Sequence, residues 1–327
     1  MGPSLSITFQ NLPEHSDAQS TDTGRSMVSP SLTNESEINL DQTSFFYATA
    51  SGDQTYEAID SHMHMDRTSR SLKRSVPLRT LEEVKSLIQP LRPKIRVDLK
   101  GVVAVYCDPD TYPINVPTSE GVKVAVGFHP KKAKLFDVTR ERLFSSLVLS
   151  PDVAALGEVG FDLTEPRDTW DRQLEVLRKV LSWCSVSKPL ILHIRGSHWE
   201  TFNPYLRVFE LVKGFCGKLQ PIHLHCFGGS VADVQGWAEF FENCYFGFTG
   251  SVKHFSADQL EGLKCVPLSR ILLETDSPYL VPDSRLAVNT PAYLGDVGRL
   301  VAQRKEVELP VLMRHALNNT RKLYKFD

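Results

Sequence analysis

Eight short apolar runs, separated by longer amphipathic segments, follow the first 54 residues of this 327-residue chain. Apolar residues at helical spacing indicate helices, and short continuous apolar runs bounded by turn residues indicate buried strands. Strands that alternate with helices form parallel sheets. The candidate strands are Ala58–His62, Gly101–Cys107, Val122–Phe128, Val153–Glu158, Leu190–His193, Pro221–His225, Tyr245–Thr249 and Ile271–Glu274.

A (β/α)8 barrel is the fold that this alternation favours. Eight strand–helix units over residues 55–327 match an architecture that typically needs about 250 residues. We therefore predict an α/β protein built as a (β/α)8 TIM barrel. A doubly wound open sheet is the alternative, disfavoured because no Gly-x-Gly-x-x-Gly follows the first candidate strand. The predicted helices are Thr80–Ile88, Thr169–Ser182, Thr201–Phe215, Val231–Phe241, Ser256–Leu263, Pro291–Val301 and Leu309–Tyr324.

The N-terminal segment has a different composition from the rest. Residues 1–54 are rich in Ser, Thr, Asn, Asp and Gln. Such a segment cannot bury enough apolar surface to offset the entropy lost on ordering. We predict a disordered polar tail over residues 1–54 and a barrel domain over residues 55–327.

Charge and cysteine content limit the class of protein. A net charge of −2 argues against a chain that coats nucleic acid by bulk positive charge, although it leaves room for a local basic face. Six cysteines without a Cys-x-x-Cys pair favour reduced thiols in the cytoplasm or nucleus. No apolar stretch reaches the ~18 residues that a membrane span needs. We expect a monomer with neither a membrane partner nor a small organic cofactor.

A His-x-His pair ends the first candidate strand. Side chains two residues apart on a strand point the same way, so His62 and His64 project together and Met63 faces away. Two converging imidazoles suit a divalent metal. Hydrogen-bonded histidines in a packed barrel end are the alternative. The motif alone is weak evidence, and His223-Leu-His225 is a second such pair.

Histidines and carboxylates recur at the ends of six candidate strands, where barrel enzymes carry their chemistry. Taken singly, each of these histidines and carboxylates has a simpler explanation as a helix cap, a turn residue or a hydrogen-bonded core histidine. Together they would converge on one point and form a metal site. Candidate ligands from six strand ends exceed the needs of one tetrahedral ion, so two ions bridged by a carboxylate, about 3.5–4 Å apart, are expected. The residues are His62, His64, His129, Glu158, His193, His223, His225, Glu274 and Asp276.

Six segments of the chain resemble, in the same order, the signatures of the TatD family of metal-dependent deoxyribonucleases. The polar N-terminal extension looks closest to the animal TatD domain-containing branch. The resemblance implies an amidohydrolase-like barrel, the metal-dependent hydrolase type, that cleaves DNA phosphodiesters and leans toward 3'–5' trimming of single-stranded ends. The segments are Ile59–His64, Gly127–Pro130, Gly157–Asp162, Leu192–Arg195, His225–Gly229 and Leu273–Leu280.

The resemblance also implies the ligand set, and it leaves His223 as a supporting or structural residue. Gly196 and Gly228 depart from the acidic and hydroxyl residues common in the family, which would change substrate contacts. By position, His62, His64 and Asp276 would hold one divalent ion, His193 and His225 would hold the other, and Glu158 would bridge them.

Two cations at such a site lower the pKa of a water and clamp the attacking and leaving oxygens at phosphorus. We assign Glu158 and Asp276 as catalytic residues: Glu158 fixes the metal spacing, and Asp276 manages the proton of the attacking water. Histidine and carboxylate ligands suit Zn²⁺ or Mn²⁺, whereas Mg²⁺ is common in the family. The identity of the metal is therefore open.

Lysine and arginine are frequent in the loops after the first and third candidate strands. We predict a track for the phosphate backbone there; solvated surface charge is the alternative. The resemblance makes Arg195 the best single phosphate contact, and Trp199 is the tryptophan best placed to stack on a base. The predicted substrate-binding residues are Arg67, Arg70, His129, Lys131, Lys132 and Arg195.

Three other functions compete with a deoxyribonuclease. A ribonuclease of the same family would need the same site. A small-molecule amidohydrolase would share the barrel, but many such enzymes bridge their metals with a carboxylated lysine where Glu158 stands. A binding protein on a relict barrel is disfavoured, because a relict site would tolerate loss of its ligands.

Overall fold

The computed structural model describes residues 54–87, 92–196 and 202–327. Its eight strands pair in chain order, each parallel to the next, which confirms the predicted (β/α)8 barrel. The prediction of a disordered tail falls, apart from Gln54, outside the described residues. The strands are β1 (Thr55–Met63), β2 (Arg96–Tyr106), β3 (Val122–Phe128), β4 (Val153–Asp162), β5 (Leu190–Arg195), β6 (Ile222–His225), β7 (Cys244–Phe248) and β8 (Ile271–Leu273).

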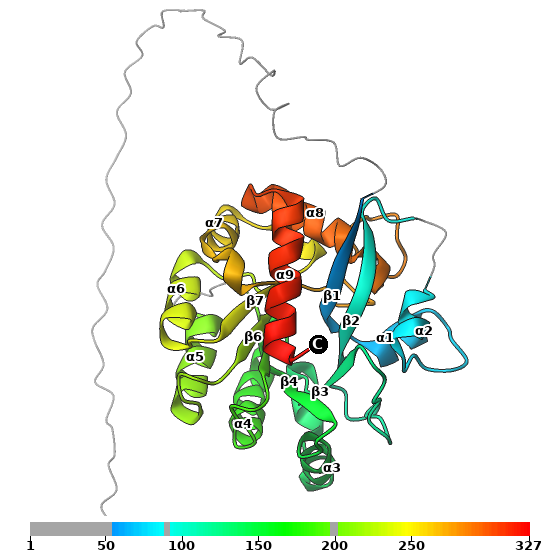
Figure 1. Ribbon diagram of the computed structural model, residues 1–327. Helices are drawn as coiled ribbons and strands as arrows, with labels where there is room; N and C mark the ends of the chain where they lie inside the picture. Colours follow the sequence, from blue (N-terminus) through cyan, green and yellow to red (C-terminus); the bar gives the residue numbers. More distant parts are fainter. Residues whose placement is uncertain (1–53, 88–91, 197–201) are drawn as a thin grey trace, which may run out of the picture. The chain divides into compact units, whose positions relative to one another are not determined.

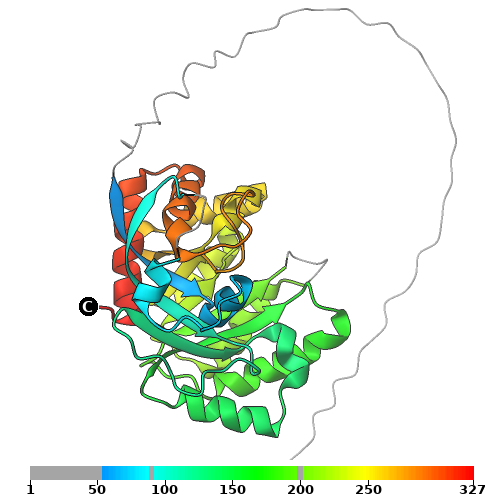
Figure 2. The ribbon, with the colours of Figure 1, turned by 90° about the vertical axis from the view of Figure 1, so that its right-hand side faces the viewer.

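Helices surround the strands, and α9 lies along the barrel with the C terminus at its end (Figures 1 and 2). Short 3₁₀ helices join several strands and helices, among them Pro130–Leu135 after β3 and Gly250–His254 after β7. The α-helices are α1 (Met65–Ser71), α2 (Leu81–Lys85), α3 (Val138–Val148), α4 (Trp170–Leu181), α5 (Pro204–Phe215), α6 (Val231–Phe240), α7 (Ala257–Cys265), α8 (Leu294–Lys305) and α9 (Leu309–Tyr324).

Two helices differ from the sequence predictions. The segment after β1, expected to be a loop, begins with α1, so Arg67 and Arg70 lie on a helix. The pattern also missed α3, in which only Phe144 and Val148 are buried while Val138 is exposed. Its apolar residues do not form one stripe, and the periodicity that identifies an amphipathic helix is therefore absent.

The strands alternate between two apolar layers. On β2, Val102 and Ala104 face the helices and belong to the large outer core, whereas Val103 and Val105 face the barrel interior. Tyr324, at the end of α9, packs in the same inner cluster. Alternate residues of each strand therefore face the barrel interior, and the residues between them face the surrounding helices.

The barrel closes between β1 and the residues that follow β8. Met63 forms a parallel bridge with Ser277. The backbone amide of Asp276 donates to the carbonyl of His62 at 3.0 Å, and the amide of His64 donates to the carbonyl of Ser277 at 2.9 Å. This closure places Asp276 directly beside the two histidines of the first strand.

A glycine allows β4 and β5 to approach closely at the end of the barrel where Asp276 meets His62 and His64. Gly160 has a φ of +158°, and a Cβ at this position would lie 1.8 Å from the carbonyl oxygen of His193. Only glycine tolerates both the backbone conformation and the contact. Glu158 and Asp162, two residues to either side, therefore face the same imidazole.

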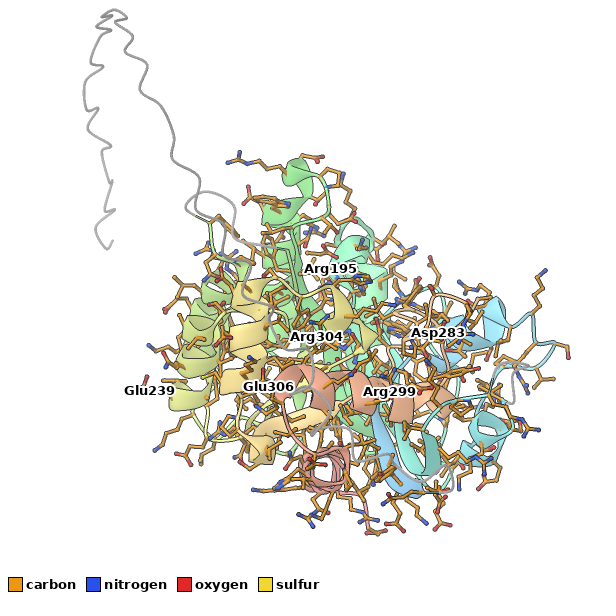
Figure 3. The ribbon with its side chains drawn as sticks, turned by 90° about the horizontal axis from the view of Figure 1, so that it is seen from above. Arg195, Glu239, Asp283, Arg299, Arg304 and Glu306 are labelled. Atoms are coloured by element: carbon orange, nitrogen blue, oxygen red, sulfur yellow. The ribbon has the colours of Figure 1, made fainter. Side chains whose placement is uncertain are left out.

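A buried lysine joins two helices behind the barrel. Lys305, 9% exposed, ends α8 and donates from Nζ to three carbonyls at the end of α7: Leu263 at 3.0 Å, Lys264 at 2.8 Å and Val266 at 2.6 Å. The positive charge satisfies orphan carbonyls and complements the helix dipole. Beside it, Lys264 pairs with Glu306 at 2.7 Å, and Figure 3 marks Glu306 at the end of α8.

Replacing this lysine should destabilise the fold. Lys305→Met keeps the aliphatic stem but leaves three carbonyls without their donor, so we expect the free energy of unfolding to fall by about 2–3 kcal/mol. Urea unfolding followed by circular dichroism measures it. Lys322→Met, an exposed lysine on α9, is the control and should change stability by less than about 0.5 kcal/mol. Equal effects of the two substitutions would contradict the capping role.

Candidate metal centre

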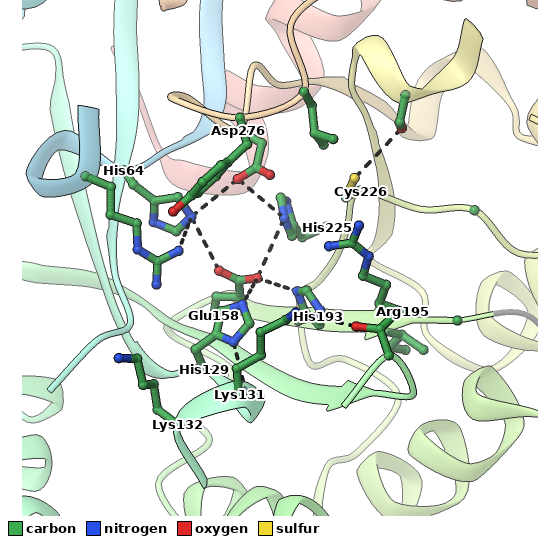
Figure 4. Close-up of a pocket in the computed structure, with 18 of the residues that line it drawn as sticks. His64, His129, Lys131, Lys132, Glu158, His193, Arg195, His225, Cys226 and Asp276 are labelled. Atoms are coloured by element: carbon green, nitrogen blue, oxygen red, sulfur yellow. Dashed lines mark hydrogen bonds and ion pairs between the residues drawn. The ribbon is translucent and has the colours of Figure 1, made fainter. Parts of the chain in front are cut away.

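One carboxylate lies at the centre of the histidine cluster. Glu158 is 1% exposed, and its two oxygens face different partners. Oε2 lies 3.6 Å from Nε2 of both His62 and His64. Oε1 lies 2.5 Å from Nδ1 of His193 and 3.7 Å from Nε2 of His225. Figure 4 shows His64, His129, His193 and His225 arranged around this carboxylate.

A second carboxylate reaches the cluster because of the barrel closure. Asp276 has a φ of +51°, an uncommon conformation for a residue with a Cβ. Its Oδ1 lies 3.3 Å from Nε2 of His64, 3.9 Å from Nε2 of His62 and 3.8 Å from Nε2 of His225. Asp276 therefore faces the same histidine nitrogens as Glu158, from the opposite side (Figure 4).

Other groups hold the outer nitrogens of the imidazoles. Nδ1 of His64 lies 2.9 Å from the carbonyl oxygen of Val105, which accepts its proton and leaves Nε2 directed at the carboxylates. Nε2 of His193 lies 3.1 Å from Oδ2 of Asp162. Such contacts fix the tautomer and orientation of a metal-binding histidine.

The sequence analysis counted Glu274 among the strand-end candidates without giving it a partner, and it gave Asp162 no role. Asp162 contacts His193, and Glu274 lies 3.1 Å from Nδ1 of His225 through Oε1. Their position in the strands was the available signal. Asp162 follows Glu158 by four residues and Glu274 precedes Asp276 by two, and even separations place side chains on one face.

Burial and charge set opposite protonation states within the cluster. Burial, with the neighbouring charge of His225, lowers the pKa of His62 to about 4. Burial alone would raise the pKa of Glu158, but His129, His193 and His225 outweigh it and hold that pKa well below its usual value. Burial also opposes charge on His225, yet the carboxylates of Glu274 and Glu158 raise its pKa to about 10.

The donor set fits divalent cations. Both ring nitrogens of His62 and Oδ1 of Asp276 are buried without a hydrogen-bond partner among the described residues. Unpartnered buried polar atoms are costly unless another group satisfies them. Imidazole nitrogens and carboxylate oxygens are ligands for Zn²⁺ or Mn²⁺. Close donor groups form around His62, His64 and Asp276, and around His62, Glu158 and His225.

Two of the predicted substrate-binding residues lie against the cluster itself. Nε2 of His129 lies 3.5 Å from Oε1 of Glu158, and His129 forms a close donor group with Glu158 and His193. Arg67 reaches in from α1: its Nη1 lies 3.3 Å from Nε2 of His64, and its Nη2 donates to Sγ of Cys107 at 3.1 Å. These two residues are thus part of the floor of the site.

The remaining predicted residues lie around a cavity of about 910 Å³ above the cluster. Arg70 and Arg195 line it and are exposed. Lys131 pairs with Glu165 at 3.1 Å, and Lys132 pairs with Asp108 at 3.1 Å, so nearby carboxylates share the charge of both lysines. Figure 4 shows Arg195, Lys131 and Lys132 around this opening. Trp199 lies outside the described residues.

Comparison with known proteins decides the family. The sequence model described as TatD related DNase matches residues 59–325, nearly all of the described chain. The chain belongs to the TatD family. The match spans all six segments whose resemblance the sequence analysis identified.

Two TatD-family relatives illustrate the range of named activities. The human "3'-5' RNA nuclease TATDN2" is 28% identical over 283 residues, covering 81% of this chain and 35% of the human protein. The "3'-5' ssDNA/RNA exonuclease TatD" of Klebsiella pneumoniae (strain 342) is 30% identical over 209 residues, covering 62% of this chain and 76% of the bacterial protein. The chain thus spans well under half the length of the human relative.

Solved structures show the same barrel. The Escherichia coli TatD homolog YJJV superposes with a TM-score of 0.63 at 18% identity, covering 83% of this chain and 98% of that one. An uncharacterized amidohydrolase from Saccharomyces cerevisiae gives 0.58 at 16% identity, covering 82% and 100%. At these identities the likeness concerns the fold alone. Among the described helices of this TatD-family chain, none is long and apolar enough to cross a bilayer.

Metal binding by this TatD-family cluster should release protons. Because the pKa of His225 is raised to about 10 in the metal-free protein, a proton occupies the imidazole at neutral pH and competes with a metal. We expect Mn²⁺ affinity to rise between about pH 6 and pH 8, about tenfold per pH unit for one displaced proton. Titration calorimetry in buffers of different ionisation enthalpy measures the Mn²⁺ affinity and the number of protons released. The control His315→Gln, on α9, should leave the affinity and the proton release unchanged. Mn²⁺ binding that does not depend on pH would contradict the assignment of His225 as a ligand.

Proposed function

We propose that the chain is a metal-dependent nuclease that removes nucleotides from the 3' end of single-stranded DNA by phosphodiester hydrolysis. The observation that carries the proposal is the position of Glu158, whose two oxygens face two separate sets of histidines. That arrangement is expected of a carboxylate that bridges two cations. Family membership and the names of the two relatives support the same class of activity.

The proposed ligands follow the geometry. Asp276, His62 at the end of β1 and His64 just after it form one close donor group and would hold one divalent cation. His193 of β5 and His225 of β6, which both face Oε1 of Glu158, would hold the other. When bound, such cations act as Lewis acids that polarise phosphoryl oxygens and lower the pKa of water. Mn²⁺, Zn²⁺ and Mg²⁺ are the candidates. The ligands are His62, His64, Glu158, His193, His225 and Asp276.

The protein's own residues would handle the proton and the negative charge. Asp276, ionised because His64 and His225 overcome the effect of burial on its pKa, can accept the proton of the attacking water. The guanidinium of Arg67, fixed between His64 and Cys107, offers positive charge to a phosphate on the cavity floor. Arg195 and Arg70 would bind neighbouring phosphates at the rim.

The depth of the cluster favours single strands. Glu158 is 1% exposed, so a scissile phosphate must enter the cavity to approach it. A flexible strand end can enter, whereas a stacked duplex must first be melted at an energetic cost. DNA is the proposed substrate, and cleavage of RNA is the alternative that the named activities of both relatives raise.

The organisation of the chain is also part of the proposal. We place the hydrolase domain at residues 55–327 and a separate polar tail at residues 1–54. All six cysteines are unpaired, which agrees with a reducing compartment, the cytoplasm or the nucleus. The active unit would be a monomer, because the six proposed ligands come from one chain.

The two catalytic carboxylates provide the central test. Glu158→Gln and Asp276→Asn should each lower kcat by a factor of about 10²–10⁴ with little change in KM, because they act on the transition state rather than on binding. The assay follows 5'-labelled DNA and RNA oligonucleotides with Mn²⁺, Zn²⁺ or Mg²⁺, in which stepwise shortening indicates 3'–5' cleavage.

Glu175→Gln, an exposed carboxylate on α4, is the matched control and should retain full activity. An unchanged kcat in either catalytic variant would contradict the assignment. Chelator-insensitive hydrolysis, or cleavage of cyclic amides with no cleavage of nucleic acid, would instead favour the amidohydrolase alternative. Binding without any turnover would favour a relict barrel.

The basic rim yields a separate prediction about substrate binding. Reversing Lys131 and Lys132 to glutamate should weaken binding of a labelled single strand and lower the slope of log affinity against log salt by about 1.4, which is ~0.7 for each lost phosphate contact. Fluorescence anisotropy with chelator present measures binding without cleavage. The double variant Arg178→Glu, Lys322→Glu changes the net charge equally on outer helices. Equal salt slopes for the two double variants would disprove the predicted track for the phosphate backbone.

A further inference from the structure

A second buried polar group lies behind the histidine cluster, inside the barrel. Glu274, 0% exposed, lies between two imidazoles. Its Oε1 is 3.1 Å from Nδ1 of His225, and its Oε2 is 2.9 Å from Nε2 of His223. Nδ1 of His223 is in turn hydrogen-bonded to the hydroxyl of Tyr324 at 2.7 Å. The four side chains form a continuous path from the end of α9 to the candidate metal centre.

The path gives each ring nitrogen of His223 a polar neighbour. The two contacts of Glu274 are close ion-pair contacts, and within the described chain these imidazole nitrogens have no hydrogen-bond partner. If the Tyr324 hydroxyl donates to Nδ1 of His223, the ring proton of His223 sits on Nε2 and faces Glu274. The other oxygen of Glu274 then favours a proton on Nδ1 of His225, which leaves Nε2 as the ligand atom.

The surrounding backbone is shaped to hold this group. A Cβ on Gly247 of β7 would lie 2.5 Å from Nε2 of His223 and 2.6 Å from Oε2 of Glu274. Only glycine leaves room for the contact. The backbone amide of Cys226 also donates to Oε1 of Glu274 at 2.5 Å. Glu274 is therefore held by β6, the residue that follows it and β7, and it has little freedom to turn away from His225.

We propose that Tyr324 and His223 are positioning residues of the metal centre, which orient His225 through Glu274 and so make metal affinity depend on the seating of α9. This inference rests on the proposed metal centre. Neither residue lines the cavity above the cluster, so neither contacts a substrate there. Contacts behind metal-binding histidines typically change metal affinity 10–100-fold when removed.

The test measures Mn²⁺ binding, not turnover. Tyr324→Phe removes only the hydroxyl and should weaken Mn²⁺ binding roughly three- to tenfold, because two residues lie between Tyr324 and the ligand His225. Glu274→Gln should weaken binding about 10–100-fold. Titration calorimetry at constant pH gives the affinities. Tyr56→Phe, another buried tyrosine in β1, is the matched control and should bind as the wild type does.

A double variant tests the path itself. If Tyr324 acts through Glu274, the variant Glu274→Gln, Tyr324→Phe should bind Mn²⁺ no more weakly than Glu274→Gln alone. Should Glu274→Gln fail to fold, His223→Gln replaces it in the same cycle. Thermal unfolding of the metal-free proteins shows whether Tyr324→Phe and Tyr56→Phe are equally stable, which separates positioning from a general loss of structure.

The outcomes separate this inference from the function it rests on. Wild-type protein that binds no Mn²⁺ overturns the metal centre and the inference together. Wild-type binding with an unchanged affinity in Tyr324→Phe overturns the inference alone. Additive losses in the double variant show that Tyr324 acts by another route, which also overturns it. Weaker binding in Tyr324→Phe with a non-additive double variant supports it.

Discussion

The site depends on keeping one buried carboxylate ionised. Glu158 is inside the barrel, where desolvation opposes its charge, and it stays ionised because imidazoles from several strands face both of its oxygens. An uncompensated charge at this depth would cost several kcal/mol. The ionised state of Glu158 therefore depends on the nearby histidines. The positions of β1, β3, β5 and β6 around β4 matter for this charge compensation as well as for packing.

Backbone geometry brings these charges together. The closure between Met63 and Ser277 carries Asp276 to the histidines of β1, and Gly160 lets His193 approach β4. Neither feature belongs to the side chains that would bind a metal. A barrel of this kind positions its chemistry through strand register, so small changes of register would separate the ligands even with every ligand residue still present.

The sequence predicted what depends on periodicity and on strand ends. The C-terminal ends of parallel strands lie at one edge of the sheet, so the sequence alone groups His62, His193 and His225. Their partners could not, because contacts between side chains depend on distances between strands. Tyr324 and His223 are 101 residues apart and share no motif. The pairing of Lys131 with Glu165 likewise depends on how two loops meet, and it reduces the charge that a composition argument would assign to the rim.

The path through Glu274 connects α9 and the inner apolar cluster to the candidate metal centre. In this fold the C-terminal ends of the strands usually carry chemistry, and the opposite face carries stability. Tyr324 packs in the inner apolar cluster, yet its hydroxyl contacts a histidine two residues from a proposed ligand. A loosened α9 would then lower metal affinity before it unfolded the barrel. Stability and metal loading would thus be linked, since a ligand that binds only the ordered state also stabilises it.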